Sequence, residues 1–594
     1  MLKSCRHILF SGLFGFLFLV LFKTGLLYHL EQYSLFCPKG DYLRMFFEQP
    51  GGILALAGAF LTQFCHYPVL GAVIFALLMA LLTFLTEKAF ALKGKAVWLS
   101  TLPALFLLFF ITRLDYSVYL FRTYGLLYSQ LLGFCVASAL VLVYRTFFLG
   151  KRAGALFVAA VVLIGYPLFG AFALLSAVLM ALLSLQEGKR GFIELALALL
   201  LGFAVPWLCR DLPGVFPRIH RKYVYFAALP YMEFLDNFIC QVPLILAASA
   251  TVALCFLRKA GRNTVMALVS LAVLAVVGAS NWDRGFHTVL GMEQAVSRQD
   301  WDKVLKLARK EKDPNRVHVL YRDIALYEKG ILLEKMFQYP DGDAPLHTLA
   351  QFPISNICGV PVLYYCGMIN PADRLAMEYS STFCKNIHYY KYQAKTALVS
   401  GEYELARKYL DMVDANWFQG EWVRRYRAFL ENPALMEADE EFQRLRPLLR
   451  NAPKDFEASG PLQEMLFAHF ANPDYVNESV FEWQAAFYLI QKDADRTLYS
   501  LFNRLELLPD APIGTALAEG AALFASEAGD ADLMRAVTSL LRNKSSVLQR
   551  FSQFGKAANN TRNSNSEETK EWFAAHYGGT YWFFYLFVDI NTKR

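Results

Sequence analysis

Hydrophobic and polar positions divide the chain into two parts of different character. Up to about Ser280, long apolar blocks alternate with short charged clusters, whereas the residues from Asn281 onward show the mixed polarity of a water-soluble chain. Apolar blocks of about 20 residues are long enough to cross a hydrocarbon layer of roughly 30 Å as helices. The pattern therefore predicts an all-α protein, with a polytopic transmembrane bundle in residues 1–285 and a second domain in residues 286–594.

The apolar blocks predict about nine transmembrane spans. One uncharged run, residues 153–186, is too long for a single span and carries Gly165 and Pro167 near its middle. We interpret it as two short spans joined by a tight turn. The blocks cover residues 8–28, 67–86, 97–112, 123–144, 153–166, 168–186, 192–209, 241–257 and 263–280.

Basic residues orient these spans. A Lys or Arg cluster precedes the first predicted span and follows every second one, beginning with Lys3, Lys88, Arg145, Lys189 and Arg258. Cytoplasmic loops carry such an excess, so we expect a cytoplasmic N-terminus. An odd number of spans then places residues 286–594 on the periplasmic or extracytoplasmic side of a bacterial inner membrane. The loops expected on that side are residues 29–66, 113–122 and 210–240.

Two ionisable residues, Lys23 and Glu194, lie in or near the apolar blocks. Both are close enough to a span end for the charged group to snorkel to the interface.

The second domain reads as one amphipathic helix after another, with loops marked by Gly, Asp, Asn and Pro. Several stretches share an Ala-rich helix, an acidic turn and a second helix, which Trp301 and Tyr403 open in two of them. These units resemble tetratricopeptide (TPR) helix-turn-helix repeats with irregular spacing, so we expect a TPR-like solenoid. The aromatic run of residues 581–587 is either a capping helix packed on the core or a segment resting on the membrane, and the pattern favours the first.

Charge and cysteine content exclude some function classes. Residues 1–285 carry 23 Lys and Arg against 11 Asp and Glu, whereas residues 286–594 carry 35 against 40. The basic excess is thus that of membrane loops, and nucleic-acid binding is not expected. The ten cysteines show no CxxC spacing, which predicts small buried apolar side chains rather than a disulfide framework or a zinc site.

Carboxylates in the outer loops are the first candidates for chemistry. Loop 29–66 carries Glu31, Asp41 and Glu48, and loop 113–122 carries Asp115 between two arginines. At a membrane surface such groups can act as a general base or as ligands of a divalent metal. They can equally solvate and cap an interfacial helix, or form a structural ion pair, and the sequence leaves these alternatives open.

The third outer loop holds a basic cluster on the side where positive charge is least expected. Clustered guanidinium and ammonium groups suit a phosphate or pyrophosphate, and they also suit anionic lipid headgroups. The cluster consists of Arg218, His220, Arg221 and Lys222.

Three stretches carry a resemblance to known proteins: EQYSLFCPKGDYLRMFFEQPGG, FLTQFCHYPVLGA and RDIALYEKGILLEKMFQYP. With them, the whole chain resembles an uncharacterised bacterial family of polytopic membrane proteins with a helical C-terminal domain. More distantly, the order of a first span, an acidic outer loop, many spans and an outer domain is similar to the GT-C superfamily of glycosyltransferases. That resemblance implies a polyprenyl-phosphate-linked sugar donor, with Asp41 as the acidic residue, Glu48 or Asp115 assisting, and the basic cluster at the donor phosphate.

Two functions therefore fit the sequence best, and a transporter is disfavoured because no buried charge pair and no inverted-repeat pattern of broken helices is evident in the sequence. The first is a GT-C-like transferase that uses a lipid-linked donor in the assembly of envelope glycoconjugates. The second is a non-enzymatic membrane-anchored scaffold or receptor whose TPR-like domain binds envelope proteins. Membrane lipids are partners in both cases, and the sequence does not decide whether the chain is an enzyme.

Overall fold

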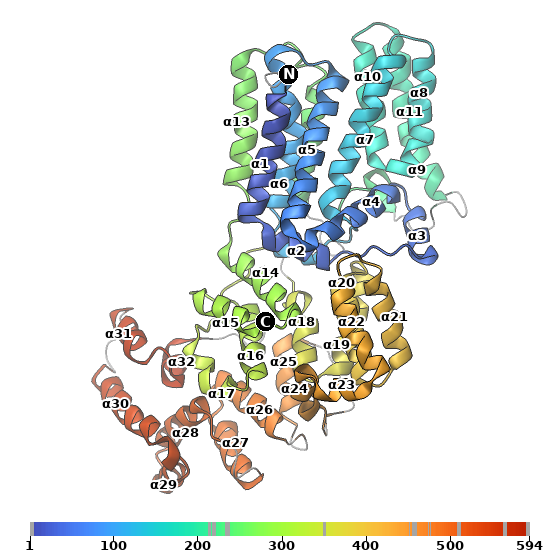
Figure 1. Cartoon of the computed structure of the whole chain (residues 1–594). Coiled ribbons are helices and arrows are strands. Elements are labelled where there is room, and N and C mark those ends of the chain that lie inside the picture. The colour runs from blue at the N-terminus through green and yellow to red at the C-terminus, as the bar shows by residue number, and fades with distance from the viewer. Residues whose placement is uncertain are drawn as a thin grey trace. The chain divides into compact units, whose positions relative to one another are not determined.

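The computed structural model describes residues 5–211, 216, 221–231, 238–348, 352–450, 452–453, 460–472, 475, 477–507, 512–561 and 567–589. Every regular element in these residues is an α-helix or a 3₁₀-helix, which confirms the predicted all-α class (Figure 1). The chain forms two compact units. Unit 1 comprises residues 1–282, 378–391 and 407–425, and unit 2 comprises residues 283–377, 392–406 and 426–594.

The first part of unit 1 is a bundle of apolar helices in which α1, α5, α6 and α7 pack side by side (Figure 1). Its elements are α1 (Arg6–Phe22), α2 (Thr24–Gln32), α3 (Gly40–Phe47), α4 (Gly52–Thr62), η1 (Gln63–His66), α5 (Pro68–Phe90), η2 (Gly94–Thr101), α6 (Leu102–Thr112), η3 (Tyr116–Leu120), α7 (Leu126–Phe147), α8 (Ala153–Leu163), α9 (Gly165–Phe169), α10 (Ala171–Leu185), α11 (Arg190–Asp211), η4 (Arg221–Phe226), α12 (Phe238–Ala253) and α13 (Arg262–Gly278).

The predicted number of about nine spans is wrong. Within the described residues, four helices are long and apolar enough to cross a membrane, and the bent pair α1 and α2 brings the number to five. The four are Pro68–Phe90, Gly94–Thr112, Leu126–Phe147 and Arg190–Arg210.

Helix breaks explain part of the difference, because hydropathy counts apolar residues but not the straight helix they form, and the last two apolar blocks form helices of fewer than 18 residues, Gln241–Ala253 and Arg262–Gly278. The first apolar block bends by 85° at Lys23. The run of residues 153–186 is divided among α8, α9 and α10, and Gly170 between the last two has a φ of 58°. The 11 residues of α8 reach only about 16 Å, roughly half of the hydrocarbon thickness.

Lys23 and Glu194 do not snorkel as expected, because both side chains are buried within unit 1. The Lys23 ammonium donates a hydrogen bond to the carbonyl oxygen of Asn281 and lies 5.2 Å from the ring centre of Trp282. The Glu194 carboxylate accepts a hydrogen bond from the Tyr144 hydroxyl. Partners inside the protein therefore replace the water that a snorkelling group would reach.

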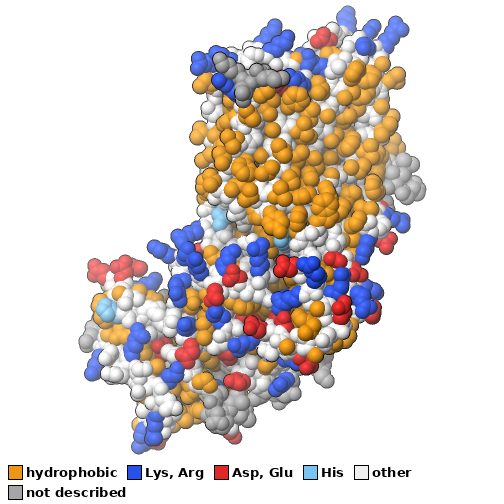
Figure 2. Space-filling view, in the orientation of Figure 1, with side chains coloured by type: hydrophobic (Ala, Val, Ile, Leu, Met, Phe, Trp, Pro, Cys, Tyr) orange, Lys and Arg blue, Asp and Glu red, His pale blue; other side chains and the backbone are white. Residues whose placement is uncertain are grey.

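Basic side chains gather at the end of unit 1 that carries the N-terminus (Figure 2). Arg145, near the end of α7, donates to the carbonyl oxygen of Lys88 near the end of α5 at 2.7 Å. Gln186, after α10, donates to the carbonyl oxygen of Cys255, after α12, at 2.9 Å. The loops that carry the predicted basic clusters thus meet at one end of the bundle, and apolar side chains cover the visible face of its helices.

Unit 2 consists of consecutive helices that pack on their neighbours, as α14 on α15, α15 on α16, α26 on α27 and α27 on α28. Helices α19 to α22 contribute residues to both units. The remaining elements of the chain are α14 (Arg284–Ser297), α15 (Trp301–Lys310), α16 (Arg316–Glu328), α17 (Leu332–Lys335), η5 (Met336–Gln338), α18 (Ser355–Tyr365), α19 (Ile369–Thr382), α20 (Ile387–Val399), α21 (Tyr403–Asp414), α22 (Gly420–Glu431), α23 (Pro433–Ala438), α24 (Glu440–Leu449), α25 (Leu462–Phe470), α26 (Glu478–Ile490), α27 (Ala494–Leu507), α28 (Thr515–Glu527), α29 (Ala531–Leu540), η6 (Arg542–Lys544), α30 (Ser545–Thr561), α31 (Glu567–Tyr577) and α32 (Tyr581–Phe587).

The aromatic run near the C-terminus is a helix of the unit 2 core, as the favoured alternative predicted. Helix α32 packs on α28, and its Trp582 is fully buried. The indole Nε1 of Trp582 donates to the backbone carbonyl of Glu519 at 2.9 Å. The indole is thus buried with its one polar group satisfied.

A close backbone approach fixes α4 against the start of α7. Gly125 has a φ of 61°, and a Cβ added there would lie 2.2 Å from the backbone nitrogen of Ala59. We expect Gly125→Ala to lower the free energy of unfolding by about 2–4 kcal/mol, through both backbone strain and overpacking. Gly150→Ala is the matched control, because Gly150 has a φ of 74° but no atom within 4 Å of the added Cβ. Thermal unfolding of the full-length protein in detergent tests this, and equal shifts for the two variants would contradict it.

Candidate binding site

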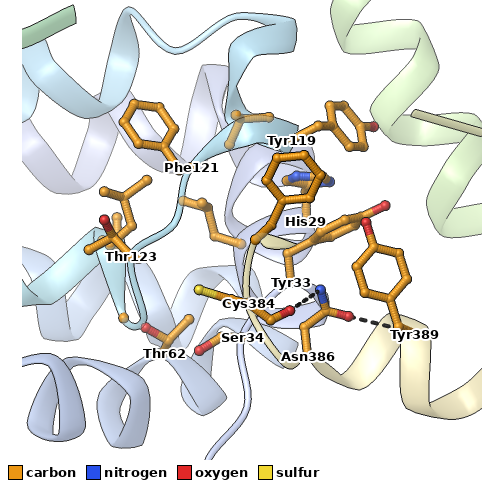
Figure 3. A pocket seen from close by; sticks show the side chains of 16 residues that line it. His29, Tyr33, Ser34, Thr62, Tyr119, Phe121, Thr123, Cys384, Asn386 and Tyr389 are labelled. Carbon is orange, nitrogen blue, oxygen red and sulfur yellow. Dashed lines mark hydrogen bonds between the residues drawn. The ribbon is translucent and has the colours of Figure 1, made fainter. Parts of the chain in front are cut away.

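A pocket in unit 1 brings together segments that are far apart in the sequence (Figure 3). We call it the α2–η3 pocket; it is lined by the end of α2 and the residues after it, by η3 and the turn before α7, and by residues 383–389. Its enclosed free volume is about 30 Å³, enough for about two water molecules, within an open hollow of about 470 Å³ that includes solvent. The enclosed part is smaller than a typical small-molecule site, so a larger ligand would occupy the open mouth or widen the pocket.

Aromatic rings form one wall of the pocket. The rings of His29 and Tyr33 stack with their centres 4.2 Å apart, and Tyr119 meets the His29 ring edge-on at 4.5 Å. Tyr389 lies edge-on to Tyr33 at 5.7 Å. These rings also cover one another, since Tyr33 stacks on His388 at 5.0 Å as well as on His29, so this wall offers ring edges with polar hydroxyl and imidazole groups more than open ring faces.

The hydroxyl groups of Ser34, Thr62 and Thr123 lie away from this aromatic wall in Figure 3, whereas the Asn386 amide lies beside Tyr389. The Ser34 side chain is only 6% exposed, and its Oγ has no hydrogen-bond partner among the described residues. A buried hydroxyl without a partner costs about 1–3 kcal/mol. Ser34 therefore presents an unused donor and acceptor to anything that enters the pocket.

The pocket lining that the structure describes contains no carboxylate, Lys or Arg. Its Cys384 is buried, and burial raises the pKa of this thiol to about 12. Because the thiolate is the nucleophilic form, Cys384 is an inert neutral group at physiological pH. The lining thus suits a neutral ligand that offers flat apolar faces and hydroxyl or amide groups.

Local chain geometry positions these groups. His29 and Tyr33 are four residues apart at the end of α2, so their side chains fall on the same face. Asp115 caps η3 by accepting a hydrogen bond from the Ser117 amide at 2.8 Å, which orients Val118 and Tyr119 toward the pocket.

Residues 383–389 are tied to unit 1 through the backbone. The Ile387 amide donates to the carbonyl oxygen of Ser34 at 3.1 Å, and the Lys385 amide donates to the Tyr124 hydroxyl at 3.2 Å. Asn386 accepts from the Tyr389 amide at 2.8 Å, which caps the start of α20 (Figure 3). These bonds hold the third side of the pocket in register with the first two.

A buried polar network lies beside the pocket, on the other face of α2. The Glu31 carboxylate is buried and accepts a hydrogen bond from Gln419 Nε2 at 2.7 Å. His66 Nδ1 lies 3.8 Å from the same carboxylate oxygen, and Lys391 Nζ donates to the side-chain oxygen of Gln32 at 3.2 Å. These hydrogen bonds hold residues 391 and 419 against α2. The polar groups of the network are thus one another's partners.

The predicted carboxylates Asp41, Glu48 and Asp115 lie outside the pocket lining. Asp41 is exposed in the first turn of α3, and Glu48 forms an ion pair with Arg44 at 3.2 Å. Asp115 is the cap of η3 described above, adjacent in sequence to residues of the pocket. The catalytic roles of Asp41, Glu48 and Asp115 stay predictions.

The predicted phosphate-binding cluster is described only in part. Arg221 is exposed at the start of η4. Arg218 and His220 lie outside the described residues, and so does the side chain of Lys222. No group of three His, Cys, Asp or Glu side chains that could hold a metal ion occurs in the described part of the chain.

Sequence reasoning singled out two of the loops that line the pocket, but other residues in them than those of the lining. Loops 29–66 and 113–122 do line the pocket, through His29, Tyr33, Ser34 and Tyr119. Their carboxylates drew attention, whereas the aromatic residues read as ordinary interfacial side chains. The four-residue spacing of His29 and Tyr33 at the end of the first apolar block was a usable signal. The sequence of residues 383–389 gave no signal that they line this pocket.

Comparison with known proteins gives a family but no activity. The model of the family described as "Family of unknown function (DUF6057)" matches residues 2–588. No curated protein and no solved structure matches the chain.

Proposed function

We propose that this chain, which belongs to the DUF6057 family over residues 2–588, is an integral membrane protein of the bacterial envelope that binds a neutral saccharide head group. The α2–η3 pocket is the binding site. The single observation that carries the proposal is its lining, in which stacked aromatic rings face neutral hydroxyl and amide groups around the partnerless Ser34 hydroxyl.

Membrane insertion is supported by the long apolar helices and by the charge distribution of unit 1. Four helices meet the length and composition of a span, and the loops with basic clusters meet at one end of the bundle. By the positive-inside rule that end is cytoplasmic, together with the N-terminus. The α2–η3 pocket then belongs to the loops that we place on the extracytoplasmic side, where lipid-linked sugars for the envelope are used.

The chemistry of the pocket supports a sugar ring as its ligand. A pyranose has apolar C–H faces that pack on aromatic rings and equatorial hydroxyls that bond to Ser, Thr and Asn side chains. A charged ligand group would lose its hydration on entering the pocket, and the described lining offers no opposite charge in return. The desolvation cost would therefore be large. A lipid-linked donor would thus place its sugar at the open mouth of the pocket, which would have to widen to enclose the ring, and its phosphate outside the pocket.

Transfer of the sugar is the finer hypothesis, and it requires an acid or base that reaches the bound ring. Of the predicted catalytic residues Asp41, Glu48 and Asp115, Asp115 is the nearest in sequence to the pocket lining, three residues before Val118. A TPR-like unit 2 would then recruit the acceptor or a protein partner. Binding is the common premise of these hypotheses, and it is tested first.

Ser34→Ala separates a ligand-binding hydroxyl from a structural one. Because the Ser34 hydroxyl has no partner, its removal should leave the ligand-free protein equally stable or stabilise it by about 1 kcal/mol. The same change should weaken binding of N-acetylglucosamine about tenfold, which is equivalent to about 1.4 kcal/mol. Saturation-transfer NMR on the full-length protein in detergent measures binding, with glucuronate as the charged comparison, and thermal unfolding measures stability.

Ser176→Ala is the matched control, because the Ser176 hydroxyl is also buried but donates to the carbonyl oxygen of Phe172 at 2.6 Å. It should lower stability by about 1 kcal/mol and leave binding unchanged. Equal binding by Ser34→Ala and the unchanged protein, or absence of N-acetylglucosamine binding, would refute the proposal.

A further inference from the structure

We infer that Trp417 and its aromatic neighbours form a membrane-interface anchor, through which residues 416–418 rest on the lipid surface. We call this group the aromatic rim; it consists of Phe60, Phe64, Tyr67, Trp417 and Phe418. All five belong to unit 1, although two of them come from a segment far along the chain. The inference rests on the proposal that the chain is a membrane protein, but not on the ligand of the α2–η3 pocket.

The rim is a continuous set of ring contacts. Trp417 meets Phe60 edge-on at 5.2 Å and Phe64 at 5.7 Å. Phe418 stacks on His66 at 5.8 Å and meets Tyr67 edge-on at 5.4 Å. The end of α4, η1 and residues 417–418 therefore form one aromatic surface rather than separate exposed rings.

Two rings of the rim are exposed to an extent that is costly in water. Trp417 is 61% exposed and Tyr67 is 56% exposed. Both have large apolar bodies with one polar atom, which suits the boundary between headgroups and acyl chains. An aqueous surface would gain nothing from holding these rings outward.

Hydrogen bonds to the rest of unit 1 fix the segment that carries Trp417. The Trp417 amide donates to Gln63 Oε1 at 3.1 Å, and Asn416 Oδ1 accepts from the Phe36 amide at 3.0 Å. Gln419 on the other side reaches the buried Glu31. The backbone is therefore held while the indole stays exposed, so the exposure does not come from a loosely packed loop.

Continuity with a candidate span identifies the lipid surface as the partner. Tyr67 immediately precedes α5, the most apolar of the candidate spans. The next turns of α5 expose Val69, Leu70 and Val73, which are the side chains that would face lipid. Trp and Tyr are enriched at the ends of such spans. A protein partner on the rim would have to share this surface with the bilayer.

Bromolipid quenching tests the inference on the full-length protein. It is reconstituted in nanodiscs of equimolar phosphatidylcholine and phosphatidylglycerol, with bromines either near the glycerol backbone or near the acyl-chain end. The fluorescence emission of Trp417 is obtained by subtracting the emission of the Trp417→Phe variant from that of the unchanged protein. We expect shallow bromines to reduce this difference at least about twofold, deep bromines to reduce it less, and aqueous iodide to have little effect.

Trp422→Phe is the matched control, because Trp422 also belongs to unit 1 and Lys391 Nζ covers its ring at 5.3 Å from the centre. Its difference emission should not respond to either bromolipid. A Trp417 difference that iodide quenches and shallow bromines do not would overturn the inference and indicate an aqueous or protein-facing rim. Release of the protein from membranes by alkaline carbonate would instead refute the proposed membrane function, so the two failures are distinguishable.

Discussion

Arg322→Ala is expected to lower the free energy of unfolding of unit 2 by about 3–5 kcal/mol, because it leaves the buried Asp323 carboxylate without its counter-charge and leaves Asp341 with Arg316 as its one remaining arginine partner among the described residues. The Arg322 side chain is 1% exposed, and its Nη2 lies 2.8 Å from an oxygen of Asp323 and 2.9 Å from one of Asp341. Its Nη1 also donates to the carbonyl oxygen of Pro340 at 3.0 Å. Alanine at this position removes all three interactions and the volume that the guanidinium fills.

The matched control is Lys329→Ala, which removes an ion pair of similar length at the surface of the same unit. Lys329 Nζ lies 2.7 Å from an oxygen of Asp302, but the two side chains are 35% and 83% exposed. This change should cost less than about 1 kcal/mol. Thermal unfolding of the full-length variants, followed by circular dichroism, measures both. A shift for Arg322→Ala no larger than that of Lys329→Ala would show that the buried pairs do not stabilise unit 2.

Unit 2 should lose stability as the pH rises from about 4.5 to about 8, and Glu328→Gln should remove much of that loss. Burial, with the nearby Glu441 carboxylate, raises the pKa of Glu328 from 4.5 to about 8. A carboxyl with a raised native pKa favours the folded state in its protonated form. Its contribution is therefore complete below pH 4.5 and is lost as the pH approaches 8, by up to a few kcal/mol.

Melting temperatures at pH 5 and pH 8 test this second expectation. At pH 8 Glu328→Gln should be clearly more stable than the unchanged protein, because the amide carries no charge to desolvate. At pH 5 the difference should be small. Glu437→Gln is the control, since Glu437 is 65% exposed in an ion pair with Arg446, and its curve should run parallel to that of the unchanged protein. An equal effect of Glu328→Gln at both pH values would contradict the expectation.

The all-α class could be predicted from the sequence because helical periodicity is a local property. The number of spans could not, because a helix break depends on single residues. Lys23 lies inside an apolar block, yet its buried contacts with Asn281 and Trp282 coincide with an 85° bend. Gly170 looked like any glycine of a membrane helix, but its positive φ ends α9.

The residues of the candidate site could be predicted only in part from the sequence, for a related reason. Hydropathy and charge pointed to the loops that contain His29 and Tyr119, since loops between apolar blocks are easily recognised. Nothing local to residues 378–391 or 407–425 indicated that they pack with the helices of unit 1. Their attachment depends on pairs such as Ser34 with Ile387 and Glu31 with Gln419, whose members are hundreds of positions apart.

The discontinuous lining of the α2–η3 pocket sets an order of events during synthesis. The helices of the bundle leave the ribosome and can enter the membrane before residues 384, 386 and 389 exist. The cavity is therefore finished late, when the chain returns to the first helices after a long excursion through α14 to α18. A fragment that stops at residue 282 would keep every candidate span but would have an unfinished cavity. Truncation at residue 282 would thus separate membrane insertion from ligand binding.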